Sequence, residues 1–138
     1  MPIEVKDVSY LYEPGSPFEK TALSHVSLTI GQGEFIGLIG HTGSGKSTLI
    51  QHLNALLAPT EGKVLYNGQD IFEEGAKERR KEIRQKVGLV FQYPEHQLFE
   101  MTVWKDVAFG PTNMKLSEEE IKERVEWAMD LVGLGPEY

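Results

Sequence analysis

The chain has 138 residues, and 14 Lys and Arg against 21 Asp and Glu give it a net charge of −7. Hydrophobic residues make up 40% and charged residues 25% of the sequence, a balance that predicts one folded domain and excludes a disordered chain. The acidic balance disfavours a nucleic-acid partner, which needs a basic surface, and the lack of cysteine excludes disulfides, iron–sulfur clusters and thiolate zinc sites.

The N-terminal part of the sequence predicts β-strands. Residues 3–12 predict a first strand, and a Pro-Gly-Ser-Pro run then marks a loop. Val26, Leu28 and Ile30 alternate with polar residues, which predicts a second strand with one face in water. We expect these strands to form a separate antiparallel layer over residues 1–34.

The middle of the chain predicts alternating strands and helices. Phe35–Ile39 and Val87–Phe91 are apolar on both faces, as expected of buried parallel strands. Leucine spacing predicts an amphipathic helix over residues 46–57, closed by Pro59, and residues 76–86 predict a charged, solvated helix. This alternation predicts an α/β fold.

Two local signals define the remaining elements. Val64–Gly68 combines an apolar strand with an Asn-Gly turn and predicts a β-hairpin. Ser117 and Glu120 form a capping box, which predicts the start of a helix. We expect the apolar face of this helix to run to Val132 and the helix to stop at Gly133.

A phosphate-binding loop is the strongest functional signal. The segment Gly40–Ser47 (GHTGSGKS) matches G-x-x-x-x-G-K-[ST] in full and lies between a predicted buried strand and a predicted helix. Glycines let a polyphosphate approach the backbone, whose N–H groups converge on it at the positive end of the helix. The alternative is a glycine-rich turn that only caps a helix. The candidate nucleotide-binding residues are Gly40, His41, Thr42, Gly43, Ser44, Gly45, Lys46, Ser47 and Thr48.

Three residues of this loop have distinct expected roles. Lys46 supplies a positive charge to the β- and γ-phosphates, the Ser47 hydroxyl can ligate Mg²⁺, and Thr48 can donate to the α-phosphate. The four histidines include no pair at i, i+4 spacing, so no zinc site is predicted. The loop alone leaves kinases, GTPases, helicases and transporter ATPases open.

The segment Val5–Tyr12 (VKDVSYLY), followed by Leu23–Glu34, resembles the start of the nucleotide-binding domain of ATP-binding cassette (ABC) proteins. In that family the N-terminal strands form an antiparallel subdomain, and an aromatic residue there stacks on adenine. The resemblance assigns this role to Tyr12, with Tyr10 as a competitor and a surface aromatic at a strand end as the alternative. It implies ATP and Mg²⁺ as cofactors.

The sequence after the predicted charged helix, residues 76–86, narrows the resemblance to one group of ABC proteins. Val87–Gln92 (VGLVFQ) resembles the family's Q-loop strand, and Gln92 would contact Mg²⁺ or the attacking water. Tyr93–Phe99 (YPEHQLF) and Thr102–Pro111 (TVWKDVAFGP) resemble the ATPases of energy-coupling factor (ECF) and cobalt-type importers. Lys46 and Gln92 are thus the candidate catalytic residues of an ATPase that couples ATP binding and hydrolysis to uptake of a cobalt or nickel ion or a vitamin.

The resemblance also implies partners and a location. The region Gln92–Pro111 would contact a transmembrane coupling subunit. The other expected partners are a second ATPase subunit, in a homo- or heterodimer, and a substrate-binding membrane component. Leu98, Phe99 and Met101 fit a docking surface, although packing under a local helix is equally compatible. No signal peptide or spanning segment is visible, so we expect a peripheral protein at the cytoplasmic face of the membrane.

The resemblance divides the chain into an antiparallel β part (1–34), a P-loop to Q-loop core (35–92) and the start of a helical subdomain (93–138). The family's signature motif, Walker B strand with its general-base Glu, and switch His have no counterpart in the sequence. We therefore expect a truncated ABC nucleotide-binding domain that self-associates and does not hydrolyse ATP by itself.

Two alternatives to a transporter subunit are a soluble ABC ATPase of DNA repair or translation and a non-catalytic nucleotide-binding fragment. The region Gln92–Pro111 favours the transporter, because soluble ABC ATPases are not expected to carry its motif.

Overall fold

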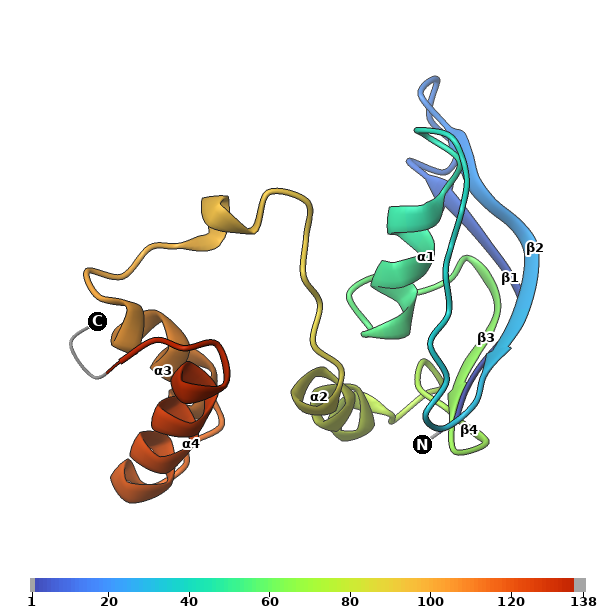
Figure 1. Cartoon of the computed structure of the whole chain (residues 1–138). Coiled ribbons are helices and arrows are strands. Elements are labelled where there is room, and N and C mark those ends of the chain that lie inside the picture. Colours follow the sequence, from blue (N-terminus) through green and yellow to red (C-terminus); the bar gives the residue numbers. More distant parts are fainter. Residues whose placement is uncertain (1, 136–138) are drawn as a thin grey trace. The chain divides into compact units, whose positions relative to one another are not determined.

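The computed structural model of the chain describes residues 2–135. The chain forms two compact units, which divide between Leu89 and Val90 (Figure 1). Each unit is described by itself below.

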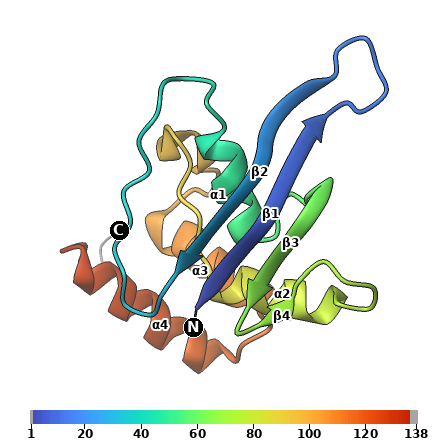
Figure 2. The same cartoon turned by 90° about the vertical axis from the view of Figure 1, so that its right-hand side faces the viewer.

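The first unit is built on a four-stranded antiparallel sheet with the strand order β2-β1-β3-β4 (Figure 2). At its centre Val5 pairs with Leu28 on one side and with Val64 on the other. The predicted N-terminal strands and the Asn-Gly hairpin are confirmed, and the antiparallel layer continues into the hairpin beyond residue 34. The strands are β1 (Ile3–Tyr12), β2 (Lys20–Ile30), β3 (Glu61–Tyr66) and β4 (Gln69–Asp70).

Two helices cover one face of this sheet (Figure 2). Helix α1 (Lys46–Leu53) contributes Leu49 and helix α2 (Lys77–Lys86) contributes Ile83 to a core cluster that includes Val64 from the sheet. The charged helix is confirmed as α2. Helix α1 ends earlier than the predicted residue 57, because Ala55 adopts a left-handed φ of 59° and turns the chain away.

The two predicted buried parallel strands are wrong. Neither Phe35–Ile39 nor Val87–Phe91 is in a strand, and the side chains of Phe35 and Ile39 are 101% and 98% exposed. An isolated strand cannot satisfy its backbone hydrogen-bonding groups, and no other strand of the described residues lies beside either segment. The two apolar segments therefore lack the neighbouring strands with which they would have to pair in order to form strands.

Helices form the second unit. It contains a 3₁₀ turn η1 (Pro94–Gln97), α3 (Val103–Asn113) and α4 (Glu118–Leu131). Val125 and Met129 of α4 are buried against Ala108 of α3. None of the helices described between residues 2 and 135 combines the length and the apolar character needed to cross a bilayer.

The predicted capping box begins α4. Ser117 Oγ accepts a hydrogen bond from the Glu120 amide at 3.3 Å, and the Glu120 carboxylate accepts one from the Ser117 amide at 3.0 Å. The capping box and the stop at Gly133, which has a φ of 73°, are confirmed. Val132, predicted on the buried face, is 71% exposed because α4 has already ended at Leu131.

We expect the 138-residue chain to self-associate, because the exposed apolar segment Phe35–Ile39 offers side chains and unpaired backbone to another copy. Sedimentation velocity at micromolar concentration should show species larger than the 15.5 kDa monomer. The double variant Phe35→Asp, Ile39→Asp should move the distribution toward monomer. Phe18→Asp, at a position that is 79% exposed outside this segment, is the matched control and should leave it unchanged. A sharply monomeric wild-type profile would contradict this expectation.

Candidate functional site

The predicted phosphate loop leads directly into the N-terminus of α1. Gly45 is the N-cap of the helix, and its carbonyl accepts the hydrogen bond from the Leu49 amide at 2.9 Å. Within the loop, the Ser44 amide donates to the His41 carbonyl at 3.2 Å and closes a turn. The first amides of α1 are therefore presented at the end of the loop, where a helix favours an anion.

Glycine is required at Gly45 for two reasons. Its φ of +89° is strained for any residue with a side chain, and a Cβ there would lie 2.5 Å from the Ala22 carbonyl oxygen of β2. A Cβ at Gly40 would lie 2.5 Å from Ser44 Oγ, whereas Gly43 has a φ of +83° but open space around it. The loop is thus packed against the backbone of the sheet at one point, Gly45.

The ammonium group of Lys46 closes the loop. Its Nζ donates to the carbonyl oxygens of Gly40 at 2.7 Å and His41 at 2.8 Å, and lies 3.3 Å from Ser44 Oγ. An ammonium has three protons to donate, and these three oxygens can accept all of them. An anion bound at the loop would have to compete with these oxygens for the charge of Lys46.

Tyr12 joins the end of β1 to α1. Its hydroxyl lies 3.0 Å from Thr48 Oγ1, and the Tyr12 side chain is 39% exposed. The ring of Tyr10 packs edge-on against both Tyr12, at 4.9 Å between centroids, and His52, at 5.0 Å. Tyr12 therefore lies beside the phosphate loop, while the role of its ring in base stacking stays a prediction.

His52 is a buried polar residue of this site that the sequence analysis did not single out. Its Nδ1 lies 2.7 Å from the Thr48 carbonyl oxygen, so this nitrogen carries the proton and donates it. Within the described residues Nε2 is buried without a hydrogen-bond partner, and burial lowers the pKa of His52 more than the backbone groups of Thr48 and Ala58 raise it. The imidazole is therefore neutral. Its position one turn after Thr48, on the face that holds Leu49, is the signal that could have identified it.

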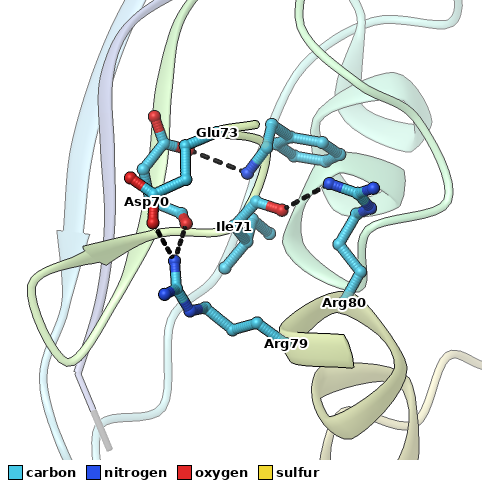
Figure 3. Close-up of polar contacts among 6 residues, drawn as sticks. Asp70, Ile71, Glu73, Arg79 and Arg80 are labelled. Carbon is cyan, nitrogen blue, oxygen red and sulfur yellow. Dashed lines mark hydrogen bonds and ion pairs between the residues drawn. The ribbon is translucent and has the colours of Figure 1, made fainter. Parts of the chain in front are cut away.

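Arginines of α2 fix this helix to the hairpin exit (Figure 3). Arg79 donates to the carbonyl of Asp70 and to the carboxylate of Glu73, and Arg80 donates to the carbonyl of Ile71 at 3.1 Å. These bonds engage both guanidinium groups inside the unit. The charged helix accordingly stabilises the fold, and its charge does not indicate a basic binding patch.

The second unit carries the remaining candidate residues. Gln92 is exposed, and its predicted contact with Mg²⁺ or water stays a prediction. Leu98 is 68% and Met101 90% exposed, so neither is packed under a helix. Phe99 is 62% exposed yet packs edge-on against Phe109 at 4.9 Å between centroids.

Asp106, at the start of α3, holds this exposed segment in shape. Its Oδ1 accepts hydrogen bonds from the amides of Phe99, at 3.4 Å, and Glu100, at 3.3 Å. The apolar side chains are therefore displayed by a loop that is anchored to a helix. This role of Asp106 was not predicted from the sequence.

A phosphate-loop sequence before a helix, beside an antiparallel sheet, is the arrangement expected of an ABC nucleotide-binding domain. The chain belongs to the ABC transporter family, whose sequence model matches residues 23–137. The predicted fold class is confirmed: an α/β P-loop NTPase with an N-terminal antiparallel β subdomain and the start of a helical subdomain.

Curated relatives confirm the narrower resemblance to ECF ATPases. The chain is 58% identical over 137 residues to the energy-coupling factor transporter ATP-binding protein EcfA2 of Caldanaerobacter subterraneus subsp. tengcongensis, covering 99% of this chain and 47% of that protein. It is also 58% identical over 134 residues to EcfA2 of Clostridium acetobutylicum, covering 97% and 46%. The chain thus spans about half the length of the curated relatives it matches.

Solved structures show the same fold. One of them is the structure of cbiO1 from Clostridium perfringens, which is part of the ABC transporter complex cbiONQ. It has a TM-score of 0.77 and 36% sequence identity to this chain, and the match covers 96% of this chain and 50% of that chain. The ATP-binding cassette MJ0796, a dimer bound to ADP and phosphate, gives a TM-score of 0.80 at 29% identity over 99% of this chain and 59% of that chain.

Gly45→Ala should destabilise the first unit more than Gly43→Ala. Both residues have a positive φ, which costs an alanine about 1–2 kcal/mol, but only at Gly45 does the added Cβ meet a backbone oxygen. Thermal unfolding followed by circular dichroism should therefore give a larger fall in Tm for Gly45→Ala. Equal falls for the two variants would show that the loop does not pack against β2 at this point.

Proposed function

We propose that this chain is the nucleotide-binding part of an ATP-binding subunit of an ECF-type ABC importer. The observation that carries the proposal is the complete phosphate loop, Gly40–Ser47, at the N-terminus of α1, with an aromatic residue of β1 hydrogen-bonded beside it. The 58% identity to two EcfA2 proteins supports the ECF type.

In this proposal the loop holds the triphosphate of ATP. The N-terminal amides of α1 and the Lys46 ammonium bind its oxygens, and Lys46 exchanges the carbonyls of Gly40 and His41 for phosphate. The exposed ring of Tyr12 stacks on the base. MJ0796, which shares the fold, is described with ADP and phosphate bound.

Oxygen ligands that suit Mg²⁺ are present at the loop. The Ser47 hydroxyl is exposed on the first turn of α1, and hard cations prefer oxygen ligands of this type. We propose that the Ser47 hydroxyl is a ligand of the ion. When bound, Mg²⁺ would neutralise charge on the β- and γ-phosphates.

We propose that the 138-residue chain binds ATP without turning it over. The loop and the first helical residues, 40–48, contain no carboxylate that could act as a general base. Binding would not require that base, because Lys46 and the amides of α1 need no further residue to bind phosphate.

The second unit supplies the proposed surface for a membrane partner. Leu98, Phe99 and Met101 are exposed on the region Gln92–Pro111, and Asp106 holds the backbone that displays them. A transmembrane coupling subunit with an apolar helix fits this surface. The solved relative cbiO1 is part of a complex, cbiONQ, which supports this assignment.

In the whole transporter we propose a dimer of ATPase subunits, of the same or of paired types, on the cytoplasmic face of the membrane. A separate substrate-binding membrane component would select the micronutrient, a cobalt or nickel ion or a vitamin. The identity to ECF subunits disfavours the soluble ABC ATPases of DNA repair or translation.

Calorimetric titration with Mg-ATP tests the proposed nucleotide site. The wild-type chain should bind ATP without releasing phosphate in a coupled assay. Lys46→Ala should weaken binding more than about tenfold, because hydrogen bonds to charged groups are worth about 1.5–3 kcal/mol. Lys63→Ala, which removes an exposed lysine of β3, is the control and should bind normally. A wild-type chain that does not bind ATP, or binding that survives Lys46→Ala, would contradict the proposal.

Co-purification with a co-expressed ECF membrane subunit tests the docking surface. Leu98→Asp should abolish it, because a charge would enter an apolar interface. Leu131→Asp is the matched control, since Leu131 is 65% exposed against 68% for Leu98 and lies on α4 of the same unit. Equal retention of the partner by both variants would rule out this surface.

A further inference from the structure

A hydrogen bond connects the residue proposed to bind the base with a residue proposed to bind phosphate. The Tyr12 hydroxyl and Thr48 Oγ1 lie 3.0 Å apart, although the two residues are 36 positions apart in the sequence. Thr48 is only 7% exposed. The geometry therefore pairs the buried threonine hydroxyl with the hydroxyl of Tyr12.

The chemistry of the two hydroxyls favours one direction for this bond. A phenol, with an ordinary pKa of about 10, is a better donor than an aliphatic alcohol. A hydroxyl can accept one hydrogen bond while donating another. With Tyr12 as the donor, the proton of Thr48 is left to point elsewhere.

We infer that the Tyr12 hydroxyl orients the Thr48 hydroxyl as a donor to the phosphate chain of the nucleotide. The inference rests on the proposed function, because it requires a phosphate at the loop. It gives Tyr12 a second role besides stacking on the base. A chain of two hydrogen bonds, from Tyr12 to Thr48 to phosphate, polarises each bond and strengthens both.

Two further residues hold this pair in place. The Tyr10 ring packs edge-on against Tyr12 at 4.9 Å and against His52 at 5.0 Å, and His52 Nδ1 donates to the Thr48 carbonyl at 2.7 Å. The four residues therefore form a closed ring of contacts between β1 and α1. Tyr10 and His52 are positioning residues in this arrangement. They fix the donor and the acceptor before any ligand arrives, so little freedom is lost on binding.

The test compares Mg-ATP with magnesium tripolyphosphate, which has the phosphates but no base. Calorimetric titrations use the wild-type chain, Tyr12→Phe, Thr48→Val and the double variant. Tyr12→Phe keeps the ring and removes only the hydroxyl. Tyr66→Phe is the matched control, because the buried hydroxyl of Tyr66 has no hydrogen-bond partner in the structure.

Tyr12→Phe should weaken binding of both ligands about three- to tenfold, the usual effect of one lost hydrogen bond. Thr48→Val should weaken binding at least as much, and the double variant should be no weaker than Thr48→Val alone, because the two hydroxyls act through one bond. Tyr66→Phe should bind both ligands like the wild type. A role of Tyr12 in fold stability alone would not produce this non-additivity.

Three outcomes would overturn the inference. Unchanged affinities for Tyr12→Phe, with Lys46→Ala still weakening binding more than about tenfold, would leave the nucleotide site standing and remove the hydroxyl's role. Additive losses in the double variant would show that the two hydroxyls act independently. Failure of the wild-type chain to bind either ligand would overturn the proposed function, and the inference with it.

Discussion

The contact between Gly45 and the carbonyl oxygen of Ala22 is the constraint on which the site depends. A side chain at residue 45 would lie within 2.5 Å of that oxygen, so only glycine lets the end of the loop approach β2 this closely. Helix α1 begins at the next residue, Lys46, and its starting point is therefore fixed relative to the sheet. Two residues into the helix, this position brings Thr48 within hydrogen-bond distance of Tyr12 at the end of β1.

The ammonium group of Lys46 holds the phosphate loop in its shape. Lys46 is bonded to the carbonyls of Gly40 and His41, so the charge that would meet phosphate is already held at the loop. The neutral His52 donates to the Thr48 carbonyl, and its Nε2 has no hydrogen-bond partner among residues 2–135, a modest cost compared with burying an imidazolium. The contacts of His52 hold Thr48 in place before binding and so reduce what binding must order, whereas Lys46 must exchange its carbonyl partners for phosphate.

Local signals made the loop, the hairpin and the capping box of Ser117 predictable, because each depends on a few adjacent residues and backbone conformations. The pairing of β-strands depends on residues far apart in the sequence. For this reason the strand predicted from the apolar pattern of Phe35–Ile39 was wrong. Helix α3 was not predicted as an element, and it carries a proline, Pro111, which is rare within a helix. The contact of Tyr12 with Thr48 requires the register of β1 and the start of α1, which no spacing in the sequence contains.

The most direct test of the account is a crystal structure of the chain with Mg-ATP. We expect the triphosphate at the N-terminus of α1 and the Tyr12 ring against the base. Lys46 Nζ should leave the carbonyls of Gly40 and His41 for phosphate oxygens. A nucleotide bound elsewhere, with Lys46 still bonded to those carbonyls, would contradict it.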